Sequence, residues 1–260
     1  MRVRRILAPN PSLFTGPGTN TYLIEDAGEA LILDPGPIED SHQRAILVAA
    51  RGLAVRAVLV THTHPDHAPL ANPLARLLEV PALGYEPGPQ FHPDHRLGEG
   101  DVIEVGETHL EAIYTPGHSD DHLCFRSGDV LFTGDHIKGG SSVLITDAGP
   151  YMNSLHRVAR LRLTRLYPGH GEEIDRPAQA ISWYIAHRQE REKEILAAVT
   201  TGCRTVGEVV DHVYKEVDPA LHDLAAYSVA AHLKKLAAES TVRFDGEAGW
   251  NAAVGLTPGS

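Results

Sequence analysis

Thr61-His62-Thr63-His64-Pro65-Asp66-His67 places four metal-binding side chains within six residues. The stretch directly follows residues 57–60, an apolar run that predicts a buried strand. Side chains two residues apart at a strand end project to the same side, so His62 and His64 can bind one ion together. Pro65 forces a bend before the next helix, so Asp66 and His67 can face a second ion. Imidazole and carboxylate suit zinc, and they are also compatible with manganese or iron.

Three later segments each place one more ligand-type residue just past a predicted strand, beside a glycine. They are Gly117-His118, Gly134-Asp135 and Gly169-His170-Gly171. Glycine lets the backbone turn tightly toward a site, and loops at strand ends often carry function. Each pair alone is common in ordinary turns. In this order after the histidine-rich stretch, however, the three segments indicate a single metal centre.

A second His-Pro-Asp-His sequence occurs at residues 92–95. It lacks both the upstream histidine and the preceding apolar strand that would fix its position. We therefore interpret it as a solvated loop without a metal role.

The remaining pattern predicts a layered domain followed by a helical one. In the first two-thirds, short β-branched runs alternate with turns and helices, which is typical of sheets covered by helices. Residues 21–24 and 30–33 predict a hairpin, residues 41–51 and 68–78 predict helices, and strands are expected at 101–105, 109–114, 122–125 and 130–133. Residues 177–199, 205–214 and 221–236 predict three more helices, followed at 242–246 by one strand and the turn of a small ribbon. This order is typical of a winged helix.

Composition excludes several classes of protein. The chain has 260 residues, 42% of them hydrophobic and 22% charged, which is typical of a globular protein and excludes global disorder. A net charge of −11 opposes nonspecific binding to nucleic acid or to an anionic membrane. Cys124 and Cys203 are too far apart to indicate a disulfide framework or a thiolate zinc site. We find no secretory signal and no apolar run that could span a bilayer, and we expect a cytoplasmic protein.

The ordered set of ligand residues resembles that of the metallo-β-lactamase-like hydrolases. This resemblance implies an α/β (α+β) fold, an αββα sandwich with two zinc ions at its edge. It assigns a first metal to His62, His64 and His118, a second to Asp66, His67 and His170, and a bridging role to Asp135. No cysteine occupies a ligand position, unlike in the lactamases that use a zinc thiolate.

Further segments resemble one branch of that family, the lactamase-β-like proteins with a C-terminal winged helix. They are the sequence around Asn20 and residues 117–122, 151–155 and 232–236. The branch includes a mitochondrial endonuclease that acts on single-stranded RNA. We therefore expect a catalytic domain at residues 1–176, a winged-helix-like domain at 177–248 and a flexible tail at 249–260.

The implied chemistry is hydrolysis by a hydroxide that bridges two metal ions. Asp66 would orient this hydroxide and carry its proton. Tyr151 and Asn153 are candidate catalytic residues that contact the substrate, and the competing interpretation of this segment is an ordinary helix start. Asp34 is either a partner of a ligand histidine or a turn residue. His122 either assists the leaving group or merely begins a strand.

Three functions remain open at this point. The first is cleavage of single-stranded RNA, and the second is hydrolysis of small esters, thioesters or lactones. The third is a binding or dimerisation module on an inactive scaffold, and a homodimer is compatible with all three. Residues 177–245 hold 8 Lys and Arg against 10 Asp and Glu, and the expected recognition helix offers only Lys234 and Lys235. We therefore predict no specific binding of duplex DNA.

Overall fold

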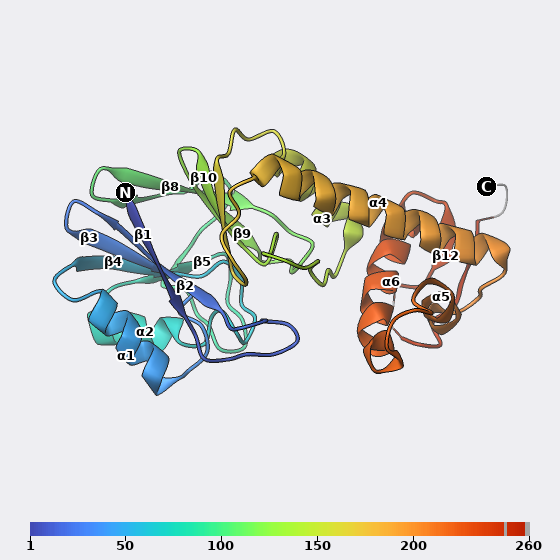
Figure 1. Cartoon of the computed structure of the whole chain (residues 1–260), viewed down its shortest axis with the longest axis horizontal. Helices are drawn as coiled ribbons and strands as arrows, with labels where there is room; N and C mark the ends of the chain where they lie inside the picture. The colour runs from blue at the N-terminus through green and yellow to red at the C-terminus, as the bar shows by residue number, and fades with distance from the viewer. Residues whose placement is uncertain (247–248, 258–260) are drawn as a thin grey trace. The chain divides into compact units, whose positions relative to one another are not determined.

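The computed structural model describes residues 1–246 and 249–257, which divide into two compact units (Figure 1). The first unit consists of Met1–Pro116, Asp121–Val143 and Leu161–Ala178. The second consists of Gly117–Asp120, Leu144–Arg160 and the described residues from Gln179 onward. The second unit therefore takes in two segments from the middle of the chain.

The first unit contains a six-stranded sheet in sequential order. Its strands are β1 (Arg2–Leu7), β2 (Asn20–Asp26), β3 (Glu29–Leu33), β4 (Ala54–Leu59), β5 (Ala82–Gly84) and β6 (His95–Arg96). The predicted hairpin is confirmed, because β2 and β3 are antiparallel with Tyr22 opposite Leu33. Strands β3 to β6 run parallel to one another, so the ends of β3 and β4 meet at one edge.

A second sheet of five strands packs against the first. Its order is β11 (Arg165–Pro168), β10 (Val130–Gly134), β9 (Leu123–Ser127), β8 (Thr108–Tyr114) and β7 (Val102–Val105). The pair β10 and β11 is parallel, and Gly134 lies opposite Pro168. This pairing makes Asp135 and His170 follow two adjacent strands at the same edge.

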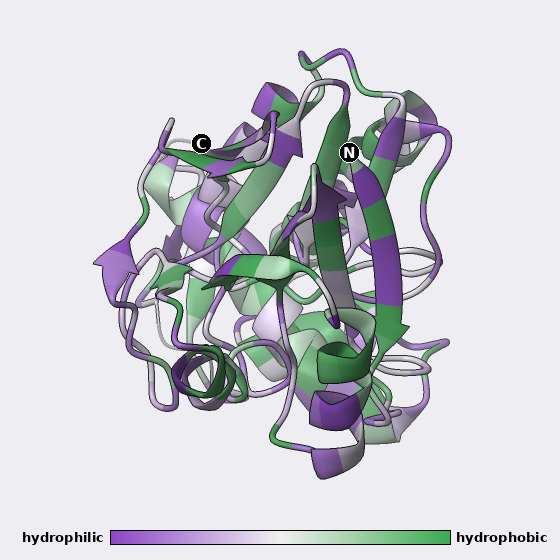
Figure 2. Cartoon of the chain, turned by 90° about the vertical axis from the view of Figure 1, so that its left-hand side faces the viewer, coloured by the Kyte–Doolittle hydropathy of each residue, from purple (hydrophilic) through white to green (hydrophobic). Residues whose placement is uncertain are grey.

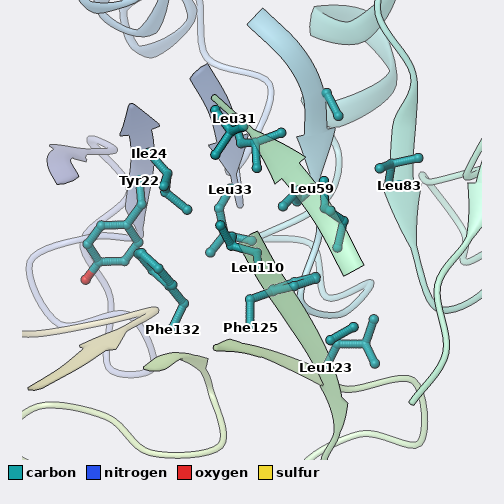
Figure 3. Close-up of a cluster of buried hydrophobic side chains, with 14 of the residues drawn as sticks. Tyr22, Ile24, Leu31, Leu33, Leu59, Leu83, Leu110, Leu123, Phe125 and Phe132 are labelled. Carbon is teal, nitrogen blue, oxygen red and sulfur yellow. The ribbon is translucent and has the colours of Figure 1, made fainter. Parts of the chain in front are cut away.

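The core between the sheets is apolar and well packed. Figure 3 shows Leu31, Leu33 and Leu59 of the first sheet facing Phe125 and Phe132 of the second. The ring of Tyr22 meets that of Phe132 edge-on, with centroids 5.4 Å apart. Each fully buried side chain of this size contributes about 1.5–3 kcal/mol, so the sandwich is a stable support for the loops at its edge.

Helices α1 (Asp40–Ala49) and α2 (Ala71–Leu78) cover the outer face of the first sheet through an apolar layer that includes Ile46 and Leu74. The predicted second helix begins later than expected, at Ala71, and Pro69 lies before it rather than in its first turn. Strand β1 was not predicted, because its arginines obscure the alternation. Figure 2 shows purple and green bands along it, as suits an edge strand with charged residues.

The second unit has its own core. It contains α3 (Ala148–Val158), most of α4 (Pro177–Thr201), α5 (Val206–Val213), a 3-10 turn (Pro219–Leu221) and α6 (His222–Ala238). Apolar residues of α4, α5 and α6 pack together with the antiparallel ribbon of β12 (Val242–Phe244) and β13 (Val254–Leu256). This confirms the predicted winged-helix-like layout.

The end of the chain differs from the expected flexible tail. Residues 254–256 form β13, because Val254 is buried in the core of the second unit and pairs with Phe244. Residues 258–260 of the predicted tail lie outside the described residues. Among the described helices, none combines the length and apolarity that crossing a membrane would need.

Candidate metal centre

The centre lies where the parallel strands of the first sheet end. Asp34 directly follows β3, and its backbone N–H donates to Leu59 O at 2.9 Å, which ties it to the end of β4. The histidine-rich stretch begins two residues after β4. Carboxyl ends of parallel strands are common positions for binding sites, because the loops that follow converge there.

Asp34 holds the stretch in place through three hydrogen bonds. Its carboxylate is 2% exposed and accepts from Thr61 N and Thr61 Oγ1, both at 2.7 Å. It also accepts from His67 Nδ1 at 2.9 Å. The structure thus supports the interpretation of Asp34 as the partner of a ligand histidine, because the bond at Nδ1 leaves His67 Nε2 to face the site.

The ligand atoms of the second predicted metal converge. His67 Nε2 and His170 Nε2 are 3.1 Å apart. Asp66 Oδ2 lies 3.1 Å and Asp135 Oδ1 3.2 Å from His170 Nε2. His170 Nδ1 donates to Gly18 O at 3.2 Å, so its Nε2 keeps a lone pair directed at this cluster.

His62 and His64 lie beside this cluster. His62 Nε2 is 3.0 Å from His64 Nδ1, and His62 Nδ1 is 2.9 Å from Thr61 Oγ1. The ligand atoms of His62, His67 and Asp135 all lie within 4.8 Å of one another. The first unit therefore brings together His62, His64, Asp66, His67, Asp135 and His170.

Close approach at the centre requires glycine at position 169. A Cβ atom there would lie 2.7 Å from His67 Cε1 and 2.9 Å from Asp135 Oδ1. Gly169 N also donates to Gly134 O at 2.8 Å, which joins the two loops. Any side chain at this position would therefore push the side chains of His67 and Asp135 aside.

The electrostatics of the cluster favour positive charge. Burial lowers the pKa of His67, but the carboxylates of Asp66, Asp34 and Asp135 raise it well above its usual value. Burial raises the pKa of Asp135, but His67 and His170 hold it well below its usual value. The same carboxylates would stabilise a bound cation.

The donor set fits divalent metal ions. Imidazole nitrogens and carboxylate oxygens gather within the distances that a shared ion needs, and two of the histidines have their other nitrogen fixed by an oxygen partner. Two neighbouring imidazole nitrogens at 3.1 Å cannot both donate to each other, whereas both can bind an ion.

The other predicted site residues belong to the second unit. His118 is buried, and its Nδ1 donates to Leu144 O at 2.6 Å. Tyr151 is fully buried on α3, whereas Asn153 is exposed. The ligand role of His118 and the catalytic roles of Tyr151 and Asn153 stay predictions.

Two residues between the predicted ligands proved to be structural. Asp121 Oδ2 accepts from Thr63 N at 2.8 Å, which fixes the backbone beside His62. The sequence did not predict this contact, although the run of polar residues after His118 indicated that the segment could form such hydrogen bonds. His122 Nε2 accepts from Asp135 N at 3.1 Å, and its Nδ1 bonds to Thr115 Oγ1 at 2.8 Å. The observed contacts of His122 thus favour a structural role, that of fixing the backbone at Asp135.

The second His-Pro-Asp-His sequence is built differently. Its two histidines are exposed, and Asp94 Oδ2 accepts from Ala82 N at 2.8 Å. Among the described residues, the converging groups of metal-binding side chains include neither His92 nor His95.

Comparison with known families matches both parts of the chain. A model described as the metallo-beta-lactamase superfamily matches residues 14–170. A second, described as the beta-lactamase associated winged helix domain, matches residues 205–250.

Two relatives align with nearly the whole chain. A beta-lactamase-like protein 2 homolog from Drosophila melanogaster is 31% identical over 93% of this chain and 89% of its own length. An atrochrysone carboxyl ACP thioesterase from Aspergillus fumigatus is 31% identical over 97% of this chain and 87% of its own.

Solved structures share the fold over the same extent. A metallo-beta-lactamase family protein from Thermus thermophilus has a TM-score of 0.79 and 22% identity, with 98% of each chain covered. A beta-lactamase domain protein from Burkholderia ambifaria has a TM-score of 0.81 and 22% identity, covering 98% of this chain and 91% of that one.

Proposed function

The chain belongs to the metallo-beta-lactamase superfamily, of which it is a hydrolase, and from this premise we propose that it hydrolyses acyl thioesters. The observation that carries the proposal is the alignment with an acyl-carrier-protein thioesterase across both the metal-binding domain and the winged helix domain. A similar alignment, 32% identical over 95% of this chain, is found with an atrochrysone carboxyl ACP thioesterase of Claviceps purpurea.

The charge of the chain supports a thioester over an RNA backbone. The whole chain has a net charge of −11. Binding of a polyanion depends on Lys and Arg that neutralise its phosphates. A thioester carbonyl is uncharged and needs no such neutralisation.

In the proposed mechanism, His62, His64, Asp66, His67, His118, Asp135 and His170 would hold two metal ions, with zinc the preferred candidate. When bound, they supply Lewis acidity and lower the pKa of a coordinated water toward about 7. Asp66 is the proposed general base, because its side chain is 25% exposed and neighbouring histidines keep it ionised. A proton taken up at Asp66 can then pass to the departing thiolate.

The pKa of Asp66 keeps its side chain ionised. Burial raises the pKa of Asp66, but His67 and His170 lower it to well below its usual value. At neutral pH the carboxylate is therefore a charged group that can bind a cation and accept a hydrogen bond from the attacking water. Asn153, exposed on α3, remains the proposed contact for the polar part of the substrate.

A direct comparison of substrates tests the proposal. The purified protein, loaded with zinc, is assayed with a series of acyl pantetheine thioesters, and the released thiol is measured with a chromogenic disulfide. Oxygen esters of the same acyl groups and a labelled single-stranded RNA are run in parallel. We expect thiol release that depends on metal and is abolished by a chelator.

Cleavage of RNA without thiol release would contradict the proposal and support the alternative, phosphodiester hydrolysis. That alternative draws on the winged helix domain and on the resemblance to the branch with an RNA endonuclease. A homodimer and a cytoplasmic location stay predictions alongside it.

A further inference from the structure

The loop that carries His118 is anchored to the segment before α3. Gly117 O accepts from Thr146 N at 2.8 Å and from Asp147 N at 3.2 Å. His118 Nδ1 donates to Leu144 O at 2.6 Å, so Nε2 keeps its lone pair for a ligand. The direction of the imidazole is therefore set by residues 144–147.

The same loop packs on the backbone of α3. Gly117 has a φ of +122°, and a Cβ atom there would lie 2.4 Å from Tyr151 N. Only glycine allows this approach. A shift of α3 would consequently move the loop and the histidine with it.

Helix α4 holds α3 through a buried cation. Arg188 is 3% exposed, and its guanidinium carbon lies 5.4 Å from the centroid of the Tyr151 ring. A guanidinium at this distance from an aromatic face is attracted to it, more strongly when water is excluded. Arg188 thus fixes the helix on which the His118 loop rests.

Helix α6 reaches the loop more directly. Lys234 Nζ donates to Thr146 O at 3.4 Å, and the N–H of the same peptide group, at Asp147, donates to Gly117 O. A charged donor at one end of a peptide polarises it and strengthens the bond at its other end. Lys234 is therefore linked to the residue before His118 through a single peptide group.

We propose that Arg188 and Lys234 are positioning residues for His118, so that the C-terminal helices set the geometry of a metal ligand. This inference rests on one part of the proposed function, namely that His118 binds the first metal. The C-terminal helices then act on a metal ligand of their own unit. A domain that only binds nucleic acid or a partner would have no such effect.

The test compares Lys234→Met and Arg188→Met with a matched control, Lys193→Met. Lys193 is an exposed lysine on α4 whose ion pair is with Glu190 on the same helix. Zn²⁺ dissociation constants are measured by competition with a chromophoric chelator, and the absorption spectrum of the Co²⁺-loaded protein reports ligand geometry. His118→Ala is measured in the same series.

We expect one of two metal equivalents to bind up to about 10-fold more weakly in both variants, the lower end of the effect for a direct partner of a ligand, because both residues act through intervening groups. The Co²⁺ spectrum should change as well, Lys234→Arg should restore it, and the control should match the parent. Binding within twofold of the parent in Lys234→Met would overturn the proposal, and this variant decides if Arg188→Met does not fold.

The premise is judged separately. If His118→Ala leaves both equivalents unchanged, His118 is not a ligand and the proposal falls. Thioester hydrolysis by the parent protein is measured in a separate assay. If that activity is absent, the proposed function fails, but the metal-binding measurements still decide whether Arg188 and Lys234 position His118.

Discussion

His-Pro-Asp-His occurs twice in the first unit, at residues 64–67 and 92–95, with opposite outcomes. The first copy follows β4, a buried strand inside the sheet, and its histidines point toward other ligand-type side chains. The second copy runs into β6, the edge strand, and its histidines are exposed. The difference indicates that strand position and buried partners, such as Asp34, allow the side chains of the first copy to gather where they could hold a metal ion.

The largest expected effect comes from removing the histidines of the first copy, with removal of those of the second copy as the matched control. The double variant His64→Ala/His67→Ala should bind less than one metal equivalent and lose more than about 10⁴-fold in turnover, because water would keep a pKa of about 15.7. The matched variant His92→Ala/His95→Ala should keep its metal and its turnover within twofold. Elemental analysis and the thioester assay check both, and the reverse pattern would mean that the second copy is the site.

The next contrast is between the aspartates of the two copies, Asp66 and Asp94. Asp66→Asn should lower turnover by about 10²–10⁴-fold, because the amide cannot accept a proton. Asp94→Asn should leave turnover unchanged. Turnover is measured by steady-state kinetics with zinc in excess, so that the metal sites stay filled and a lower turnover reports loss of the general base. Turnover of Asp66→Asn within threefold of the parent would rule out its role as general base.

A substitution at Asp34 sharpens the comparison, because it alters a buried partner that only the first copy has. Asp34→Asn should weaken metal binding by about 10–100-fold, because the partner that orients His67 is altered. Chelator competition measures this directly. Unchanged affinity would show that the bond to His67 contributes to folding alone.

The smallest effect is expected for the structural aspartate of the second copy. Asp94→Ala removes the acceptor for Ala82 N and should lower the thermal midpoint by about 2–4 °C. Activity below the transition should be that of the parent. Calorimetry checks the first expectation, and a matching loss of bound metal would be the contradictory result.

Local patterns predicted much of the fold. The apolar runs at 57–60 and 130–133 correspond to β4 and β10, and the ends of these strands were enough to identify the ligand-type residues that follow. The arginine-rich strand β1 and the two-residue strand β6 were missed, because edge strands carry little apolar alternation. β13 was missed because its burial depends on a core formed by distant helices.

The hydrogen-bond partners of the ligand-type residues were harder to predict than those residues themselves. The bond from His170 to Gly18 O joins residues that are 152 positions apart, and a backbone carbonyl leaves no mark in the sequence. The role of His122 depends on the tautomer fixed by Thr115 and by the Asp135 N–H. Such contacts follow from topology, which residue types do not encode.

Asp34 has one further consequence, for protein engineering. Its φ is +49°, a left-handed conformation that glycine would adopt without strain. A redesign guided by backbone conformation alone would therefore favour Asp34→Gly, which relaxes the backbone by about 1 kcal/mol. That change would also delete the three acceptor bonds of the carboxylate. Each lost bond leaves a buried donor without its acceptor at a cost of about 1–3 kcal/mol, so the loss exceeds the gain and libraries for this chain should keep position 34 fixed.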